Sequence, residues 1–330
     1  MRLFFLMFVF FVWVLHSSCK KEKSEPTDTL HPVTLNYPSY FPELADPEIP
    51  LTEEAIALGR RLYYDPVLSN TGQSCASCHL QNQGFSEYSS NSLPHVNLAW
   101  NRYYLWNGKI QGSLEDAMRF EVFQFFNTDV SKLQNESNYP LLFERVFGTP
   151  DIQLNHVAQA LAQFVRTLIS QNSRLDHYLR QELMLSDAEL RGLYIFNTER
   201  GDCFHCHTLG MFTDGLFHNN GLDSNFTQGN IGRYSVTGLI QDQGKFKTPT
   251  LRNVRQTAPY MHDGRYKTLE EVIEFYNSGV RQSATLDPIM TKSSFENGLG
   301  LSSQEKADLL AFLYALSDST FLNQPAFSSP

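Results

Sequence analysis

The chain has 330 residues, of which 26 are Lys or Arg and 35 are Asp or Glu, so its formal net charge is −9 at pH 7. This acidic balance argues against nucleic-acid binding, which depends on neutralising phosphates with Lys and Arg, and it favours a partner with a basic docking face. The length suits two domains, each with its own hydrophobic core.

The first predicted element is an export signal at residues 1–18. Arg2 precedes an apolar run from Leu3 to Leu15, which is too short to span a bilayer and is typical of a secretory signal. Small residues then precede Cys19, a pattern similar to a bacterial lipoprotein signal in which Cys19 becomes the lipidated N-terminus. His16 stands where such signals usually have Leu. An ordinary signal peptide and an uncleaved anchor are the alternatives, and all three export the chain.

Residues 19–50 are rich in Pro, Thr and Glu and show no hydrophobic periodicity, so we expect a lipid-anchored tether. With Cys19 as the membrane anchor, the sequence predicts a periplasmic lipoprotein, attached to the outer membrane of a Gram-negative bacterium.

Beyond residue 50 the hydrophobic spacing predicts helices. Thr52 opens the first of them, and residues 151–170 hold another with apolar side chains on one face. No stretch shows the sustained alternation of a strand, so we expect an all-α fold. Three capping boxes, each followed by an apolar-periodic run, begin at Ser186, Thr268 and Ser302.

Two copies of the pattern C-x-x-C-H carry the chemistry. They are Cys75-Ala76-Ser77-Cys78-His79 and Cys203-Phe204-His205-Cys206-His207. In c-type haem attachment, two thiols add across the vinyl groups of one haem and the adjacent His ligates the iron. Two copies therefore predict two covalently bound haem c groups, the first on Cys75, Cys78 and His79 and the second on Cys203, Cys206 and His207. A Cys₄ zinc site is the alternative, but it would leave the His idle in both copies.

One haem per domain is the simplest partition. It predicts two tandem cytochrome c-type haem domains with long loops, at residues 51–180 and 181–320. Attachment of c-type haem is completed outside the bacterial cytoplasm, which agrees with the predicted export signal.

Longer segments carry a resemblance to a known family. The most specific block runs from Thr248-Pro249-Thr250-Leu251-Arg252-Asn253-Val254 to Thr257-Ala258-Pro259-Tyr260-Met261-His262-Asp263-Gly264, and Trp106-Asn107-Gly108-Lys109 matches a Trp-Asp-Gly-Arg segment. On these residues the chain resembles the bacterial di-haem cytochrome c peroxidase family, which also contains the MauG-type enzymes. The resemblance implies two α-helical cytochrome c domains whose haems face a shared interface.

The resemblance also implies a division of labour. The haem on His79 would bind H₂O₂ and break its O–O bond. The haem on His207 would take electrons from a small periplasmic cytochrome c or cupredoxin. Trp106 would relay electrons between the haems, and a packed core aromatic is the alternative for this residue.

A Ca²⁺ ion between the haems is a further implication of the resemblance. Its protein ligands would be Asn91 and the backbone carbonyls of Thr257 and Pro259, oxygen donors that suit a hard cation. The alternative for Asn91 is a loop residue with no ligand role. A homodimer is a candidate assembly.

The chain departs from the family at the distal ligand of the second haem. Many members supply a Met 14 residues after the His of the second block, whereas position 262 + 14 here is Tyr276, as in MauG-type members. We expect Tyr276 to ligate iron as a phenolate, which stabilises Fe(III). A buried Tyr with a satisfied hydroxyl is the alternative, and Met261 and Met290 are the alternative ligands.

The second departure concerns the acid–base residue of the first haem. With one inserted residue near Gln111, the family's Gln, Pro and catalytic Glu positions fall on Ala117, Glu121 and Asn127. Asn127 cannot move a proton. We therefore expect Glu121 to supply this function, with Asp129 as its competitor.

These observations predict an exported di-haem c-type peroxidase that reduces H₂O₂ to water with electrons from a small redox protein. The Trp106 segment and the match along most of the chain favour this function. MauG-like oxidation of Tyr or Trp residues on a partner protein is an alternative, favoured by Tyr276. A di-haem electron carrier without peroxidase activity is another, favoured by Asn127.

Overall fold

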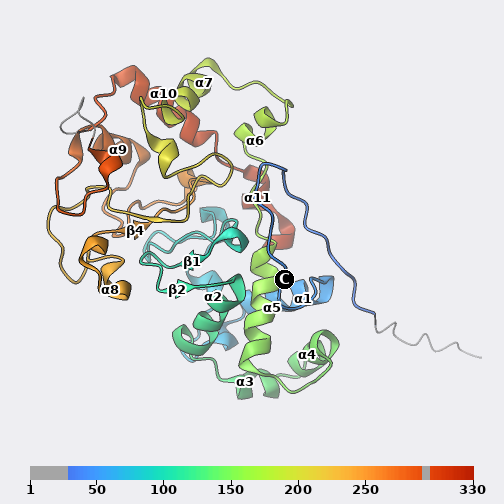
Figure 1. Cartoon of the computed structure of the whole chain (residues 1–330). Helices are drawn as coiled ribbons and strands as arrows, with labels where there is room; N and C mark the ends of the chain where they lie inside the picture. Colours follow the sequence, from blue (N-terminus) through green and yellow to red (C-terminus); the bar gives the residue numbers. More distant parts are fainter. Residues whose placement is uncertain (1–28, 292–297) are drawn as a thin grey trace, which may run out of the picture.

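The computed structural model describes residues 29–291 and 298–330, so the predicted signal peptide and Cys19 lie outside the described residues. The chain is mostly helical, as predicted (Figure 1). The α-helices are α1 (Glu53–Tyr64), α2 (Leu114–Phe120), α3 (Val130–Asn135), α4 (Tyr139–Phe147), α5 (Leu154–Arg166), α6 (Arg174–Leu179), α7 (Asp187–Phe196), α8 (Tyr234–Thr237), α9 (Leu269–Glu274), α10 (Ser303–Tyr314) and α11 (Ser319–Asn323). None of them, over the part of the chain that the structure describes, combines the length and apolar character that crossing a bilayer needs.

Two pairs of very short strands accompany the helices. Strand β1 (Tyr103–Tyr104) pairs antiparallel with β2 (Ile110–Gln111), and β3 (Phe217–His218) pairs antiparallel with β4 (Phe246–Lys247). Strands of two residues cannot show hydrophobic alternation, which is why the sequence pattern does not reveal them.

The predicted helix starts are confirmed by their caps. Thr52 accepts a hydrogen bond from the backbone N–H of Ala55 at the start of α1. The capping boxes at Ser186, Thr268 and Ser302 open α7, α9 and α10, and each satisfies two otherwise unpaired backbone donors.

The buried apolar residues form two main clusters, each built around a crossing of two helices. In the first cluster α1 crosses α5 at Gly59, where a Cβ atom would lie 1.9 Å from the Ala160 carbonyl oxygen. In the second cluster α7 crosses α10 at Gly192, where a Cβ atom would lie 2.0 Å from the Asp308 carbonyl oxygen. The two lobes in Figure 1 correspond to these clusters.

The same short hairpin occurs once in each half of the chain. The first copy pairs Tyr104 with Ile110, and the second pairs Tyr260 with Tyr266. In both copies the residue that follows the first pairing residue has a positive φ, and it is Leu105 in the first copy and Met261 in the second. The glycine three positions further on also has a positive φ in both copies. The equivalent residues are Leu105 with Met261, Trp106 with His262 and Gly108 with Gly264.

Each hairpin leads into a capped helix that ends in a π-helical turn. Ser113 caps α2, which continues into η5 (Glu121–Phe125), and Thr268 caps α9, which continues into η9 (Phe275–Gly279). Glu121 and Tyr276 both lie eight residues after their caps (121 − 113 and 276 − 268) and therefore take equivalent positions. Turns of this type are rare and frequently occur at functional sites.

Residues 29–50, the described part of the predicted tether, lie against the body of the molecule (Figure 1). Phe41 is 5 % exposed, and the indole N–H of Trp100 donates to the Pro42 carbonyl at 2.7 Å. The C-terminal residues pack on the first cluster, where Tyr64 donates to the Phe327 carbonyl at 2.6 Å. Both ends of the described chain thus cover the lobe that contains α1.

Candidate functional site

The first C-x-x-C-H motif forms one tight turn. Cys75 begins the 3₁₀ helix η2 (Cys75–Ser77), and the backbone N–H of His79 donates to the Cys75 carbonyl at 3.0 Å. The His79 Nδ1–H donates to the Phe85 carbonyl at 2.8 Å, which leaves Nε2 available as a ligand. Burial lowers the pKa of His79 to about 4, so its imidazole is neutral, the form that binds metals.

The second motif repeats this arrangement. Cys203 begins η6 (Cys203–His205), and the His207 Nδ1–H donates to the Phe212 carbonyl at 2.9 Å. Burial lowers the pKa of His207 as well. Phe85 and Phe212 both have positive φ values, 57° and 54°, so the acceptor loops have the same local backbone conformation.

A cavity of about 250 Å³ adjoins the second motif. Cys203, Cys206 and His207 line it. The His262 Nε2 atom is buried beside the cavity and has no hydrogen-bond partner among the described residues. Two thiols, the His207 imidazole and an unpaired buried polar atom around one cavity fit a covalently attached haem with polar groups of its own.

The three candidate distal ligands of the second haem line the same cavity. They are Tyr276, Met261 and Met290. The Asn220 amide donates to the Tyr276 hydroxyl at 3.0 Å and contacts the Met261 sulfur at 3.6 Å. Burial raises the pKa of Tyr276 to about 12. The structure therefore brings Tyr276 to the predicted place, and its ligation of iron stays a prediction.

Trp106 and the predicted calcium ligands meet at this cavity too. The Trp106 indole N–H donates to the Asn91 carbonyl at 3.4 Å. The Asn91 amide nitrogen donates to the carbonyls of Met261 and His262, both at 3.0 Å, so its amide oxygen is the atom that remains for a cation. Thr257 and Pro259 also line the cavity, as Asn91 does, so all three predicted calcium ligands border the same cavity.

Glu121 and Asp129, the two candidate acid–base residues, have different surroundings. Glu121 lies in η5, where burial raises its pKa to about 7, and its charge contributes to the raised pKa values of Cys75 and Cys78. Asp129 is exposed and caps α3, accepting from Ser131, whose hydrogen bonds lower the pKa of Asp129. Of the two, Glu121 therefore combines partial burial with proximity to the first motif.

Two cavity residues were missed by the sequence analysis. Lys247 is 5 % exposed, and burial lowers its pKa to about 8. His262 served only as a reference for counting to Tyr276, yet its ring stacks on Phe246 with centroids 3.6 Å apart. Lys247 comes directly before the Thr248–Gly264 block and His262 lies within it, so their place in that block was the available signal.

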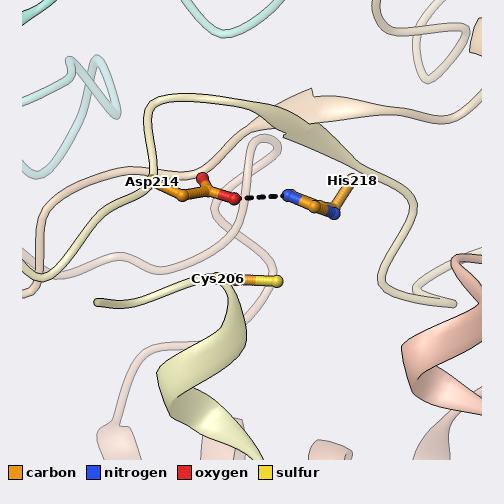
Figure 2. A group of neighbouring side chains, drawn as sticks. All are labelled: Cys206, Asp214 and His218. Atoms are coloured by element: carbon orange, nitrogen blue, oxygen red, sulfur yellow. Dashed lines mark hydrogen bonds and ion pairs between the residues drawn. The ribbon is translucent and has the colours of Figure 1, made fainter.

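Figure 2 shows Cys206 beside His218 and Asp214, a group whose ligand atoms lie within 4.8 Å of one another. His218 bonds to Asp214 through Nε2 at 2.8 Å and to Asp287 through Nδ1 at 2.6 Å. The hydrogen bond to Asp214 is the largest of the causes that raise the pKa of His218 to about 11. An imidazole that donates from both nitrogens has no lone pair for a metal. His218 and its two carboxylate partners therefore form a charged cluster beside Cys206, where the sequence predicts a thioether bond to haem.

Comparison with known proteins gives a consistent result along most of the chain. Residues 53–183 match the family model described as di-haem cytochrome c peroxidase. The methylamine utilization protein MauG of Methylorubrum extorquens is 34% identical over 289 residues, covering 81% of this chain and 79% of the relative. The cytochrome-c peroxidase IdrP2 of Denitromonas iodatirespirans is 30% identical over 311 residues, covering 80% of this chain and 82% of the relative.

A solved structure agrees with these relatives. The crystal structure of a MauG-like protein associated with microbial copper homeostasis has a TM-score of 0.82 and 32% sequence identity. The similarity covers 90% of this chain and 99% of that one.

Proposed function

Because this chain belongs to the family of di-haem cytochrome c peroxidases and MauG proteins, we propose that it reduces H₂O₂ to water with electrons from a small redox protein. The proposed donor is a small cytochrome c or cupredoxin. In this proposal residues 51–180 form a peroxidatic domain and residues 181–320 an electron-transfer domain. The two haems supply the iron redox chemistry, and the protein supplies ligands, proton transfer and positioning.

One observation carries the proposal. Glu121 and Tyr276 occupy equivalent positions at the ends of α2 and α9. A phenol at this position can ligate iron, whereas a buried carboxyl can hold and transfer a proton. The difference supports a division of labour, with an open site at His79 for peroxide and a ligated site at His207 for electrons.

Each residue has a role in this proposal. His79 and His207 are the proximal ligands, and the carbonyls of Phe85 and Phe212 hold their rings in the ligating tautomer. Glu121 takes the proton from the near oxygen of peroxide and gives it to the far one. Trp106 lines the cavity beside the second motif and relays electrons between the two sites.

A second candidate function is the MauG-like oxidation of Tyr or Trp residues on a partner protein. Tyr276 favours it, as does the similarity to a protein named MauG. The two functions are separated by steady-state turnover of H₂O₂ with a reduced small cytochrome or cupredoxin. We expect H₂O₂ turnover that depends on the donor. A holoprotein that reacts with peroxide but oxidises neither the cytochrome nor the cupredoxin favours the MauG-like function. Two haems inert to peroxide leave only an electron carrier.

Tyr276→Phe is expected to change the iron ligation of the second haem. The predicted phenolate ligand stabilises Fe(III), and a ferric ion offsets the burial that raises the pKa of Tyr276 to about 12. Phenolate bands in the resonance Raman spectrum should disappear in Tyr276→Phe, and the haem potential should rise. Identical spectra and potentials in the variant and the wild type would make Tyr276 a packing residue.

Breaking one C-x-x-C-H motif is expected to leave the other haem attached. The two motifs belong to separate hydrophobic clusters. The double variant Cys75→Ser, Cys78→Ser should therefore keep the second haem. The double variant Cys203→Ser, Cys206→Ser should keep the haem on the first motif. Haem staining after denaturing electrophoresis measures this. Staining that vanishes in either double variant, or zinc in place of iron, would contradict the assignment.

We also propose a periplasmic location with a lipid anchor on Cys19. The lipid chains of a lipoprotein hold it firmly on a membrane, whereas a single acyl chain binds only marginally. The wild-type protein should therefore fractionate with membranes and Cys19→Ser should not. Equal partition of the two proteins would reject the anchor.

A calcium ion held by Asn91, Thr257 and Pro259 completes the proposal. Elemental analysis of the purified holoprotein tests it, with Asn91→Ala as the variant expected to lose the ion. Calcium content that is the same in both proteins would place the ion elsewhere.

A further inference from the structure

The proximal side of the first haem site contains a buried pair that the proposed function does not use. Tyr63 lies in α1 and is fully buried, and its hydroxyl is 3.1 Å from His95 Nδ1. The His95 ring stacks on the ring of His79, with centroids 3.5 Å apart and planes 19° from parallel. Tyr63 is thus connected to the predicted iron ligand through one intervening imidazole.

The pair belongs to only one of the two sites. The backbone N–H of His95 donates to the Phe85 carbonyl at 3.0 Å, the same oxygen that accepts from His79. In the second site the backbone N–H of Leu251 donates in the same way to the Phe212 carbonyl, at 3.3 Å. His95 therefore stands where the second site has a leucine, and packing alone does not require an imidazole there.

The direction of the hydrogen bond between Tyr63 and His95 follows the tautomer of His95. Burial raises the pKa of Tyr63 well above its usual value, so the hydroxyl carries its proton. With the His95 proton on Nε2, that hydroxyl donates to Nδ1 at 3.1 Å, and this is the tautomer that the pair requires. A phenol whose proton already points at a base can lose an electron without leaving a buried positive charge on its own ring.

We propose that Tyr63 and His95 form an oxidisable pair on the proximal side of the first haem. Tyr63 would give one electron to the haem that His79 would hold, with H₂O₂ as the oxidant. The phenolic proton passes from Tyr63 Oη to His95 Nδ1, which leaves a neutral tyrosyl radical and an imidazolium. One electron from outside restores the phenol, and the proton returns to it. This inference rests on the proposed function, which supplies H₂O₂ as the oxidant.

A second tyrosine continues the path toward solvent. The Tyr64 ring lies 5.3 Å from the Tyr63 ring, and its hydroxyl reaches the Phe327 carbonyl near the C-terminus. Tyr64 is partly exposed. An oxidising equivalent can therefore leave the first site through His95, Tyr63 and Tyr64, a route that does not include Trp106.

Freeze-quench EPR of the holoprotein after one equivalent of H₂O₂ tests the proposal. We expect a radical signal that narrows when the protein is made with ring-deuterated tyrosine, and that is lost in Tyr63→Phe. His95→Leu, which copies the residue of the second site, should also lose it because the proton acceptor is gone. Tyr139→Phe is the matched control, since Tyr139 is equally buried in the same cluster but bonds to Asp65, and it should keep the signal.

Two results would overturn the inference. One is a tyrosyl signal that persists in Tyr63→Phe, and the other is no tyrosyl signal in a wild-type protein whose haem spectrum does change with peroxide. If peroxide leaves both haem spectra unchanged, the proposed function is wrong. The Tyr63–His95 pair is then tested on its own, with photogenerated ruthenium(III) tris-bipyridine as the oxidant. A Tyr63-dependent signal is still expected with that oxidant, and its absence would reject the pair on its own.

Discussion

Glu121→Gln is expected to lower peroxide turnover by about 10²–10⁴-fold, the range for loss of a positioned acid–base group. Cleavage of the O–O bond needs a group that moves a proton from one oxygen to the other. Glu121 is a partly buried carboxyl near the first motif, and Gln keeps its shape without its proton chemistry. Steady-state turnover with a reduced donor measures the loss.

The pH dependence gives this prediction a second readout. Burial raises the pKa of Glu121 to about 7, so wild-type turnover should rise with pH through that value as the carboxylate forms. That limb should be missing in Glu121→Gln. Folding raises the pKa of Glu121, so the folded protein favours the protonated carboxyl. The stability that this contributes is present below the pKa of Glu121 in the unfolded chain and is lost as the pH rises toward 7. The Gln variant should therefore be no less stable than the wild type above pH 7, and its loss of turnover cannot come from unfolding.

Asp129→Asn is the matched control for Glu121. Asp129 is exposed and accepts from Ser131 at the start of α3, so its substitution should affect the helix cap and leave turnover near the wild-type value. A large loss confined to Asp129→Asn would transfer the acid–base role to that residue. Equal turnover in all three proteins would mean that neither carboxyl moves the proton.

The second large effect is on stability. Arg252→Met is expected to lower the free energy of unfolding by about 3–5 kcal/mol, because it leaves a buried carboxylate without its charged partner. Arg252 and Asp176 are 1 % and 0 % exposed, and both guanidinium nitrogens reach the carboxylate at 2.9 Å. The Arg252 Nε–H also donates to the Gly210 carbonyl at 2.8 Å, two residues before Phe212.

The segment before α1 belongs to the same cluster. Tyr40 donates to Asp176 at 2.7 Å, and the Arg252 guanidinium lies 4.7 Å from the centre of the Phe41 ring. Desolvation is the largest single influence and would raise the pKa of Asp176, but the hydrogen bonds and charge of Arg252, together with the hydrogen bonds from Ser173 and Tyr40, lower that pKa to about 2. The stability from this pair is therefore present above the usual Asp pKa and is lost as pH falls through about 2.

Arg191→Met is the control for Arg252→Met. Arg191 makes the same two-pronged contact with Asp308, at 2.8 Å for both bonds, but the Arg191 side chain is 55% exposed while that of Asp308 is 3% exposed. Water can reach this pair from the Arg191 side, and the Gln304 amide also donates to Asp308 at 3.0 Å, so the loss should be smaller than for Arg252→Met. Chemical denaturation of the three proteins measures the difference. Equal losses in the two variants would show that burial of the Arg252 pair adds nothing.

The predictions that succeeded from sequence were those set by local chemistry. The boxes at Ser186, Thr268 and Ser302 join residues three apart, and all three begin helices in the structure. The family resemblance likewise depended on contiguous motifs. The helix predicted over residues 151–170 is shorter, as α5 covers Leu154–Arg166, because hydrophobic periodicity alone does not mark where a helix ends.

The features that the sequence did not reveal depend on contacts between distant segments. Tyr40 meets Asp176 across 136 positions, and no spacing rule connects them. Residues 29–50 look like a free tether because their apolar side chains are few and irregular, yet Phe41 is buried against Trp100. The equivalence of Glu121 and Tyr276 requires the shared hairpin, whose strands are too short to leave a pattern.

The most direct test of the proposed function is the absorption and EPR spectrum of the ferric holoprotein before and after stoichiometric H₂O₂. We predict two c-type haems, one of them a high-spin centre that reacts with peroxide and is lost in His79→Gly, and the other a low-spin centre altered in Tyr276→Phe. Two low-spin haems that are both inert to peroxide, or a reactive centre that depends on His207 instead of His79, would contradict it.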